Sequence, residues 1–288
     1  MAFYTIFTDS ACDIPVNTLR EWNVGCVNLT FRFDGQDIEY SDGEIASSEF
    51  YDRMRQGGIA KTSAINTENF KIAFTAELEA GHDIIYIGFS SGLSTTYNSA
   101  RLAAQELSEQ YPERKILTID SLAASAGFGL LIALAAEKRD EGADIQMLAD
   151  YVTSLIPRLC HWFTVDDLVY LKRGGRVSPT VAFVGNLLGI KPVLHVDDEG
   201  HLINMTKVRG RRAAIMALAQ KYGELHDASA TNRAFISHGD CEEDAKLLKQ
   251  IVEEKYGAQV DLITPVGTVI GAHSGPGTLA FFFLATQR

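Results

Sequence analysis

The stretch from residue 84 to residue 100, IIYIGFSSGLSTTYNSA, constrains the fold more than any other part of this 288-residue chain. It opens with a short, largely β-branched apolar run, Ile84 to Phe89, which predicts a buried parallel strand. A Ser/Gly loop follows, and from Tyr97 onward apolar residues recur at helical spacing. A strand that passes through a short loop into a helix is the repeating unit of an α/β fold.

The loop between this strand and helix predicts an anion-binding site. The free N–H groups at a helix N-terminus and the positive end of the helix dipole both attract an anion. Ser94 is placed to cap the helix, and the neighbouring hydroxyl groups add hydrogen-bond donors without charge. The alternative is that Ser94 is only a helix cap and that the other hydroxyl groups only solvate the loop. The hydroxyl-bearing residues are Ser90, Ser91, Ser94, Thr95 and Thr96.

The rest of the chain predicts two α/β domains, residues 1–160 and 161–288. In the first, strands alternate with helices, which indicates a mostly parallel sheet with helices on both faces. Ligands of such sheets bind at the carboxyl ends of the strands, so we expect Asp9-Ser10 and the Ser90–Ser94 loop to converge there. The second domain contains a predicted β-hairpin around the turn at residues 197–200 and ends in an apolar strand, residues 278–285.

Several local predictions can be checked directly. We expect one strand over Val24–Phe33, a loop at Lys61–Ser63, and a capping box over Thr164–Asp167 that opens a short helix. A further helix is expected from Ser178 to Gly189, and a Gly/Pro-rich loop over Gly271–Gly277.

The amino-acid composition narrows the classes of molecule that this chain is expected to bind. The chain has 26 Lys and Arg against 37 Asp and Glu, a formal net charge of −11, which argues against nucleic acid or an anionic membrane as the main partner. The four scattered cysteines show no metal-binding spacing and are typical of free thiols in a reducing cytoplasm. No signal peptide is evident, and the apolar stretch at residues 123–136 is too short to span a bilayer. We therefore expect a cytoplasmic protein.

One catalytic motif is present in the sequence. Residues Gly88 to Gly92 match G-x-S-x-G between a strand and a helix, which is typical of a serine esterase with Ser90 as nucleophile. Asp240 and His273 follow in the required order. The hydroxyl groups after Gly92 indicate that the helix begins too late for a nucleophile elbow, and no oxyanion segment precedes the motif.

A third class is a phosphate-handling enzyme that uses Asp9 and Asp13 with Mg²⁺. No recognisable constellation of metal ligands accompanies these two residues, so we rank it last and expect no metal site.

Seven short motifs follow one another along the chain: TDS at residues 8–10 with Cys12-Asp13, KTS at 61–63, SSGLS at 90–94 with Thr96-Tyr97, LKRGGR at 171–176, Lys191-Pro192, Lys207 with Arg209-Gly210, and GAHSGPG at 271–277. In this order they resemble the DegV family of bacterial fatty-acid-binding proteins, and the resemblance runs from end to end. Two departures are visible: Thr62-Ser63-Ala64-Ile65 stands where the family has Thr-Ser-Gln-Pro, and Thr95 stands where Gly is usual. The first departure leaves the preferred acyl chain length open.

The resemblance implies a function as well as a fold. It implies one long-chain fatty acid, such as palmitate, stearate or oleate, held between the two domains, with no cofactor and no catalysis by this chain. It also implies that the carboxylate is presented to a separate ATP-dependent fatty acid kinase, which makes the acyl phosphate. Transient exchange of the fatty acid at a membrane surface is compatible with this role.

The resemblance also assigns residues. The carboxylate-binding residues it implies are Thr62, Ser94, Ser91, His273 and Arg173. Supporting loop residues are Asp9, Ser10, Ser63, Gly92, Thr95, Thr96, Gly271, Ser274 and Gly275, and the candidates for contact with the partner are Arg176, Lys207 and Arg209. Hydroxyl and amide donors hold a carboxylate by charge-assisted hydrogen bonds, and the tail requires an apolar tunnel. The stretches expected to line it are residues 123–136, 183–190 and 281–284.

Overall fold

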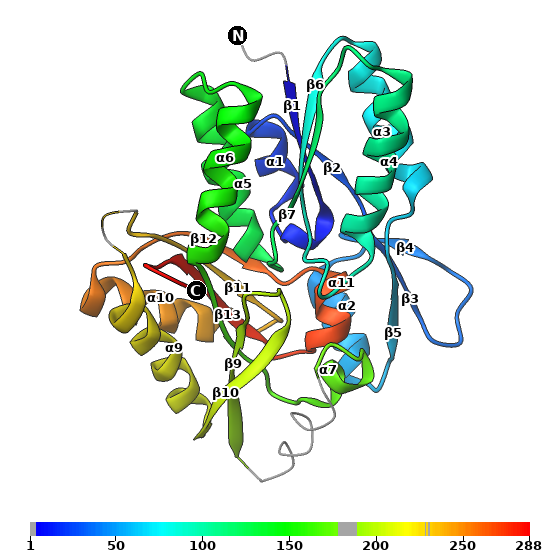
Figure 1. Cartoon of the computed structure of the whole chain (residues 1–288). Coiled ribbons are helices and arrows are strands. Elements are labelled where there is room, and N and C mark those ends of the chain that lie inside the picture. The colour runs from blue at the N-terminus through cyan, green and yellow to red at the C-terminus, as the bar shows by residue number, and fades with distance from the viewer. Residues whose placement is uncertain (1–3, 178–188, 228, 230) are drawn as a thin grey trace.

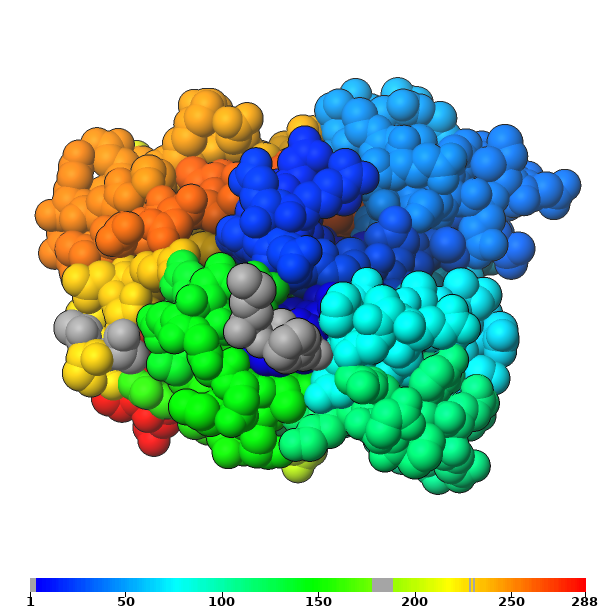
Figure 2. All heavy atoms as spheres, turned by 90° about the horizontal axis from the view of Figure 1, so that it is seen from above, coloured from blue at the N-terminus to red at the C-terminus, as the bar shows by residue number. Residues whose placement is uncertain are grey.

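The computed structural model describes residues 4–177, 189–227, 229 and 231–288 and confirms the α/β class. A parallel sheet built from the first half of the chain stands above a mixed sheet built from the second half (Figure 1). Figure 2 shows from above that helices α5 and α6 (green) and α3 and α4 (cyan to blue-green) lie on either side of the N-terminal residues (blue). One apolar core runs from the first sheet into the second. The domain boundary predicted between residues 160 and 161 therefore stays a prediction.

The first sheet has four parallel strands in the order β2–β1–β6–β7. Helices α3 and α4 cover one face, and α5 and α6 cover the other (Figure 1). The elements of this half are β1 (Tyr4–Asp9), η1 (Ser10–Cys12), α1 (Val16–Glu21), β2 (Val24–Val27), α3 (Thr67–Glu79), β6 (Asp83–Gly88), α4 (Thr96–Gln110), β7 (Ile116–Asp120), α5 (Ala126–Asp140), α6 (Ile145–Leu155) and η2 (Ile156–Arg158).

Helix α5 joins the two halves. Every residue from Ala126 to Ala136 is buried, because α5 packs on β6 of the first sheet and on β8, β11 and β13 of the second. A helix covered on all sides needs no polar face, which explains its Ala- and Gly-rich sequence. The predicted buried core helix is therefore confirmed.

The second sheet is mixed, in the order β10–β9–β8–β13–β11–β12, and only β11 and β12 pair in parallel. Helices α9 and α10 pack on it (Figure 1), and the predicted hairpin is confirmed as β9 and β10. The elements are β8 (Leu159–Thr164), α7 (Val169–Arg173), β9 (Ile190–Val196), β10 (Leu202–Arg209), α9 (Arg211–Leu225), β11 (Arg233–His238), α10 (Glu242–Tyr256), β12 (Gln259–Pro265), α11 (Thr268–Ser274) and β13 (Leu279–Leu284).

A small antiparallel sheet, β4–β3–β5, corrects two predictions. Residues 61–63 are not a loop: they lie in β5 (Ala60–Ser63), which pairs with β3 (Thr30–Phe33). The predicted single strand over residues 24–33 is two strands, because β2 pairs in the large sheet and β3 in the small one. Both errors have the same cause, since a strand partner distant in the sequence decides the pairing. The remaining elements here are β4 (Tyr40–Ser41) and α2 (Ser47–Arg55).

Two local predictions in the second half are wrong. Thr164 does not open a helix; it pairs with Leu279 at the end of β8, and the helix starts later, at Val169. The segment expected to be a Gly-rich loop forms helix α11 up to Ser274. A side chain at Gly271 would lie 2.5 Å from the Tyr51 hydroxyl oxygen, so glycine here permits α11 to pack on α2. The helix expected from 178 to 189 lies almost wholly outside the described residues.

Candidate functional site

A cavity lies between the two sheets, at the carboxyl ends of β6 and β7, where the parallel sheet predicts a ligand site. Its empty volume is about 970 Å³, open solvent at its mouth included. The wall is mostly apolar, with a few polar groups. Its lining residues are Leu29, Thr62, Ala64, Phe89, Leu93, Ser94, Thr95, Ala124, Ser125, His161, Phe163, Leu171, Arg176, Val196, Leu202, Ser237, Val266, Val269, Ile270, His273, Ser274, Thr278, Ala280 and Phe282.

Thr62 and His273 meet at one end of this cavity. The Thr62 hydroxyl oxygen lies 2.8 Å from His273 Nε2, and these residues come from β5 and α11 respectively. Burial, with a smaller effect of the nearby Arg176 guanidinium, lowers the pKa of His273 to about 4. The imidazole is therefore neutral at pH 7 in the unliganded protein, and it can donate to or accept from Thr62.

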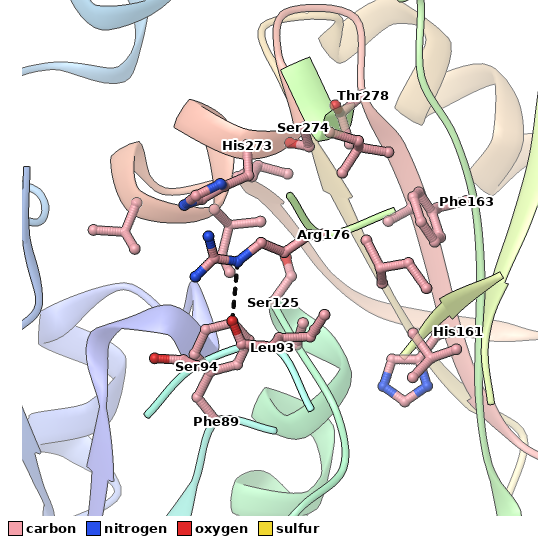
Figure 3. Close-up of a pocket in the computed structure, with 18 of the residues that line it drawn as sticks. Phe89, Leu93, Ser94, Ser125, His161, Phe163, Arg176, His273, Ser274 and Thr278 are labelled. Atoms are coloured by element: carbon pink, nitrogen blue, oxygen red, sulfur yellow. Dashed lines mark hydrogen bonds between the residues drawn. The ribbon is translucent and has the colours of Figure 1, made fainter. Parts of the chain in front are cut away.

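Arg176, which was predicted to contact a partner, lies beside this pair and lines the cavity. A partner contact at this position stays a prediction. Figure 3 shows its side chain between His273 and Ser94, and its Nε donates to the carbonyl of Leu93 at 3.0 Å. Burial lowers the pKa of the guanidinium, which still remains charged at neutral pH. The expected uncharged anion site thus contains a cation.

Ser94 reaches the cavity from the loop before α4. Its Oγ accepts the N–H of Thr96 at 3.2 Å and lies 2.9 Å from the Thr96 hydroxyl, as its predicted capping role requires, although Thr95 occupies the N-cap position. The other loop amides are less available than predicted. The N–H of Ser91 donates to Asp120, and those of Gly92, Leu93 and Ser94 donate to oxygen atoms of Ser90. The hydroxyl groups and Arg176, rather than these amides, face the cavity.

Of the other predicted site residues, Thr95 and Ser274 line the cavity and the rest do not. Ser91, Ser63, Arg173, Lys207 and Arg209 are exposed, and the Arg173 guanidinium lies over the Tyr170 ring. The glycines Gly92 and Gly275 have packing roles. Gly92 lies against the backbone of residues 199–200, and Gly275, with a φ of 81°, lies against the ring of Tyr170.

Asp9 and its neighbours support the loops from behind. The buried Asp9 carboxylate accepts from the Tyr86 hydroxyl at 2.6 Å and from the N–H groups of Phe89 and Ala11, while Ser10 Oγ accepts from Leu29 N–H. Desolvation raises the pKa of Asp9 to about 6 despite these bonds.

Asp13 is also engaged by the protein. It accepts from the Ser125 hydroxyl and from Gly267 N–H, and burial raises the pKa of Asp13 well above its ordinary value. Within the described residues there is no group of three or more His, Cys, Asp or Glu side chains that could hold a metal ion.

The residues named for an esterase do not assemble. Ser90 is fully buried, and its hydroxyl donates to the carbonyl of Gly200 at 3.0 Å. Asp240 pairs with Arg55 on the surface, and the His273 ring contacts Thr62. The G-x-S-x-G match is explained by packing, because this loop lies against the turn of the β9–β10 hairpin.

The apolar wall was only partly predicted. From the expected stretches, Ala124, Ser125 and Phe282 line the cavity, whereas residues 183–188 lie outside the described residues. His161 and Phe163, which were not predicted from the sequence, line the cavity from alternate positions of β8. They pair with Phe282 and Ala280 on β13. Because alternate residues of a strand face the same side, the spacing of two residues could have indicated that His161 and Phe163 share a face.

Comparison with known proteins shows the family of this chain. The family model described as "Uncharacterised protein, DegV family" matches residues 4–286. A DegV domain-containing protein of Clostridium perfringens is 41% identical over 289 residues, which cover 100% of this chain and 99% of that protein. A fatty acid-binding protein of Thermotoga maritima is 33% identical over 291 residues, 98% of each chain. The solved structure of a stearic acid-binding protein from Eubacterium ventriosum matches with a TM-score of 0.88 at 27% identity over 98% of each chain. The chain therefore belongs to the DegV family.

Proposed function

We propose that this chain binds one long-chain fatty acid in the cavity between its sheets. The observation that supports the proposal most strongly is that one cavity has hydroxyl groups and a guanidinium at one end and an apolar wall along the rest of its length. Relatives with matching folds that bind fatty acids support it. The carboxylate would lie among Thr62, Ser94, His273 and Arg176.

The chemistry of the polar end suits a carboxylate. A carboxylate only accepts hydrogen bonds, so each neighbour must present a proton. If His273 Nε2–H donates to Thr62, the Thr62 hydroxyl proton is free for the ligand, and if Thr96 donates to Ser94, the Ser94 proton is free as well. Arg176 supplies a charge-assisted bond, which is stronger than a bond between neutral groups.

The apolar wall would hold the tail. Burial contributes about 0.8 kcal/mol per methylene group, so a chain of about sixteen carbons gains most of its affinity there. Phe89, Phe163 and Phe282 supply large apolar surfaces to this wall.

The finer proposal is that the protein is a carrier without catalytic activity of its own, which presents the carboxylate to a separate ATP-dependent kinase. The exposed cations Arg173 on α7 and Lys207 and Arg209 on β10 are our candidates for contact with that partner. We place the protein in the cytoplasm, which its four unpaired cysteines support. No helix among the described residues is long and apolar enough to cross a membrane.

Native mass spectrometry of the purified protein tests the binding proposal. We expect one co-purified fatty acid per chain, and uptake of added stearate by delipidated protein. A ligand-free spectrum together with no stearate uptake would contradict the proposal.

Substitution of Gly174 tests the place of the His273 ring. A Cβ atom at position 174 would lie 2.1 Å from His273 Nδ1, while the φ of −72° there accepts alanine. Gly174→Ala must therefore displace the ring, and we expect stearate binding to weaken by about tenfold, because the displaced ring no longer orients the Thr62 hydroxyl group toward the carboxylate. Isothermal titration calorimetry measures this. In a His273→Ala background the same substitution should have little further effect, and an equal loss in both backgrounds would contradict the argument.

The low pKa of His273 predicts a pH dependence of binding. A bound carboxylate favours the imidazolium and raises the pKa of His273 from about 4, so the complex takes up protons more readily than the free protein. Stearate affinity should therefore rise as the pH falls from neutrality toward the free-protein pKa of about 4, by at most about tenfold per pH unit for one proton. The His273→Gln variant should show a flatter profile, and identical profiles would count against a carboxylate at this position.

A further inference from the structure

His161 is a buried polar group that the proposed head-group site does not use. It lies on β8 with no exposed surface, and it lines the same cavity. Neither ring nitrogen has a hydrogen-bond partner among the described residues. Figure 3 shows His161 well separated from His273, on the opposite side of the cavity.

The surroundings of this ring are built to hold it. Its edge contacts the Phe282 ring, with ring centroids 5.6 Å apart. A Cβ at Gly127 would lie 2.5 Å from His161 Nε2 and 2.8 Å from Phe282 Cδ1, so only glycine at the start of α5 leaves room for the two rings. The backbone carbonyl of His161 accepts from His195 Nδ1 at 2.9 Å, which anchors the strand at this position.

The imidazole of His161 is neutral, and its nitrogen atoms lack hydrogen-bond partners among the described residues. Burial, together with the charges of Arg288 and His195, lowers the pKa of His161 well below its ordinary value. A neutral imidazole carries one N–H donor and one acceptor nitrogen, and leaving such groups buried without partners is costly. A saturated acyl chain lying against Phe163 and Phe282 offers nothing to either nitrogen.

We propose that His161 selects acyl chains that carry a hydroxyl group along the tail, so that the cavity takes hydroxylated long-chain fatty acids in preference to plain ones. The inference rests on the proposed fatty-acid function and deepens it. A hydroxyl group both donates and accepts, so it can pair with a nitrogen of the His161 ring in either tautomer. A keto group only accepts, and a double bond offers only weak contacts.

Binding of stearate and of a series of hydroxystearates, with the hydroxyl group at successive carbons, tests this inference. We expect at least one positional isomer to bind native protein roughly tenfold more tightly than stearate, the effect of satisfying one buried polar group. His161→Phe should abolish that preference, so that stearate and its hydroxylated isomers bind the variant equally. His161→Gln keeps a donor and an acceptor and should retain part of the preference, and it also serves if the Phe variant does not fold.

The outcomes separate the two proposals. If native protein binds stearate but prefers no hydroxylated isomer, or if His161→Phe keeps the same preference, the role of His161 is wrong while the fatty-acid function stands. A stearate complex in which an ordered water satisfies His161, without preference for any isomer, also overturns the inference. If native protein binds none of these acids, the proposed function itself fails.

Discussion

The double variant Thr62→Val, Ser94→Ala should bind stearate about a hundredfold more weakly than native protein, because each hydroxyl group lost removes one charge-assisted bond of about 1.5–3 kcal/mol. Both hydroxyl groups line the polar end of the cavity, and Val has nearly the shape of Thr. The single variants should each lose about tenfold, and calorimetric titration of delipidated protein measures all three.

The neighbouring hydroxyl groups provide a matched control. Ser63 and Ser91 are exposed and do not line the cavity, so Ser63→Ala and Ser91→Ala should bind as native protein does. If the double variant of Thr62 and Ser94 stays within twofold of native affinity, the head group lies elsewhere. If Ser91→Ala weakens binding as much as Ser94→Ala, the exposed loop belongs to the site.

Asp42→Ala should lower the free energy of unfolding by about 2–3 kcal/mol and weaken stearate binding as well. Asp42 Oδ1 accepts the N–H of Thr268 at 2.9 Å, the Thr268 hydroxyl at 2.6 Å and the N–H of Val269 at 3.4 Å. It therefore caps the N-terminus of α11, the helix that carries His273 at its other end. Without the cap, three donors lose their acceptor and the helix is free to shift.

Urea unfolding followed by circular dichroism, with binding measured in parallel, tests the cap. Asp42→Asn keeps an acceptor oxygen and should lose less than about 1 kcal/mol. Asp37→Ala changes an exposed carboxylate on the neighbouring turn and should change neither quantity. Equal losses for the Ala and Asn variants would show that the negative charge, and not the accepted hydrogen bonds, holds α11.

Local sequence patterns were enough to predict much of the fold. The apolar run at residues 84–89 and the Ala-rich helix at 126–140 were predicted because a fully buried element has no polar face to obscure the signal. The β9–β10 hairpin was predicted because its turn residues are adjacent in the sequence. Residues 61–63 were misjudged because their strand partner, β3, lies about thirty residues earlier.

The same distinction between local patterns and distant contacts applies to the site. The sequence by itself determined that this is an α/β protein with hydroxyl groups after a buried strand, since strand, loop and helix there are contiguous and their chemistry is local. Only the tertiary structure decided that Thr62 meets His273 across 211 positions and that Arg176 and His161 face one cavity. These contacts join segments whose approach depends on how two sheets pack around α5, and no short pattern in the sequence encodes that packing.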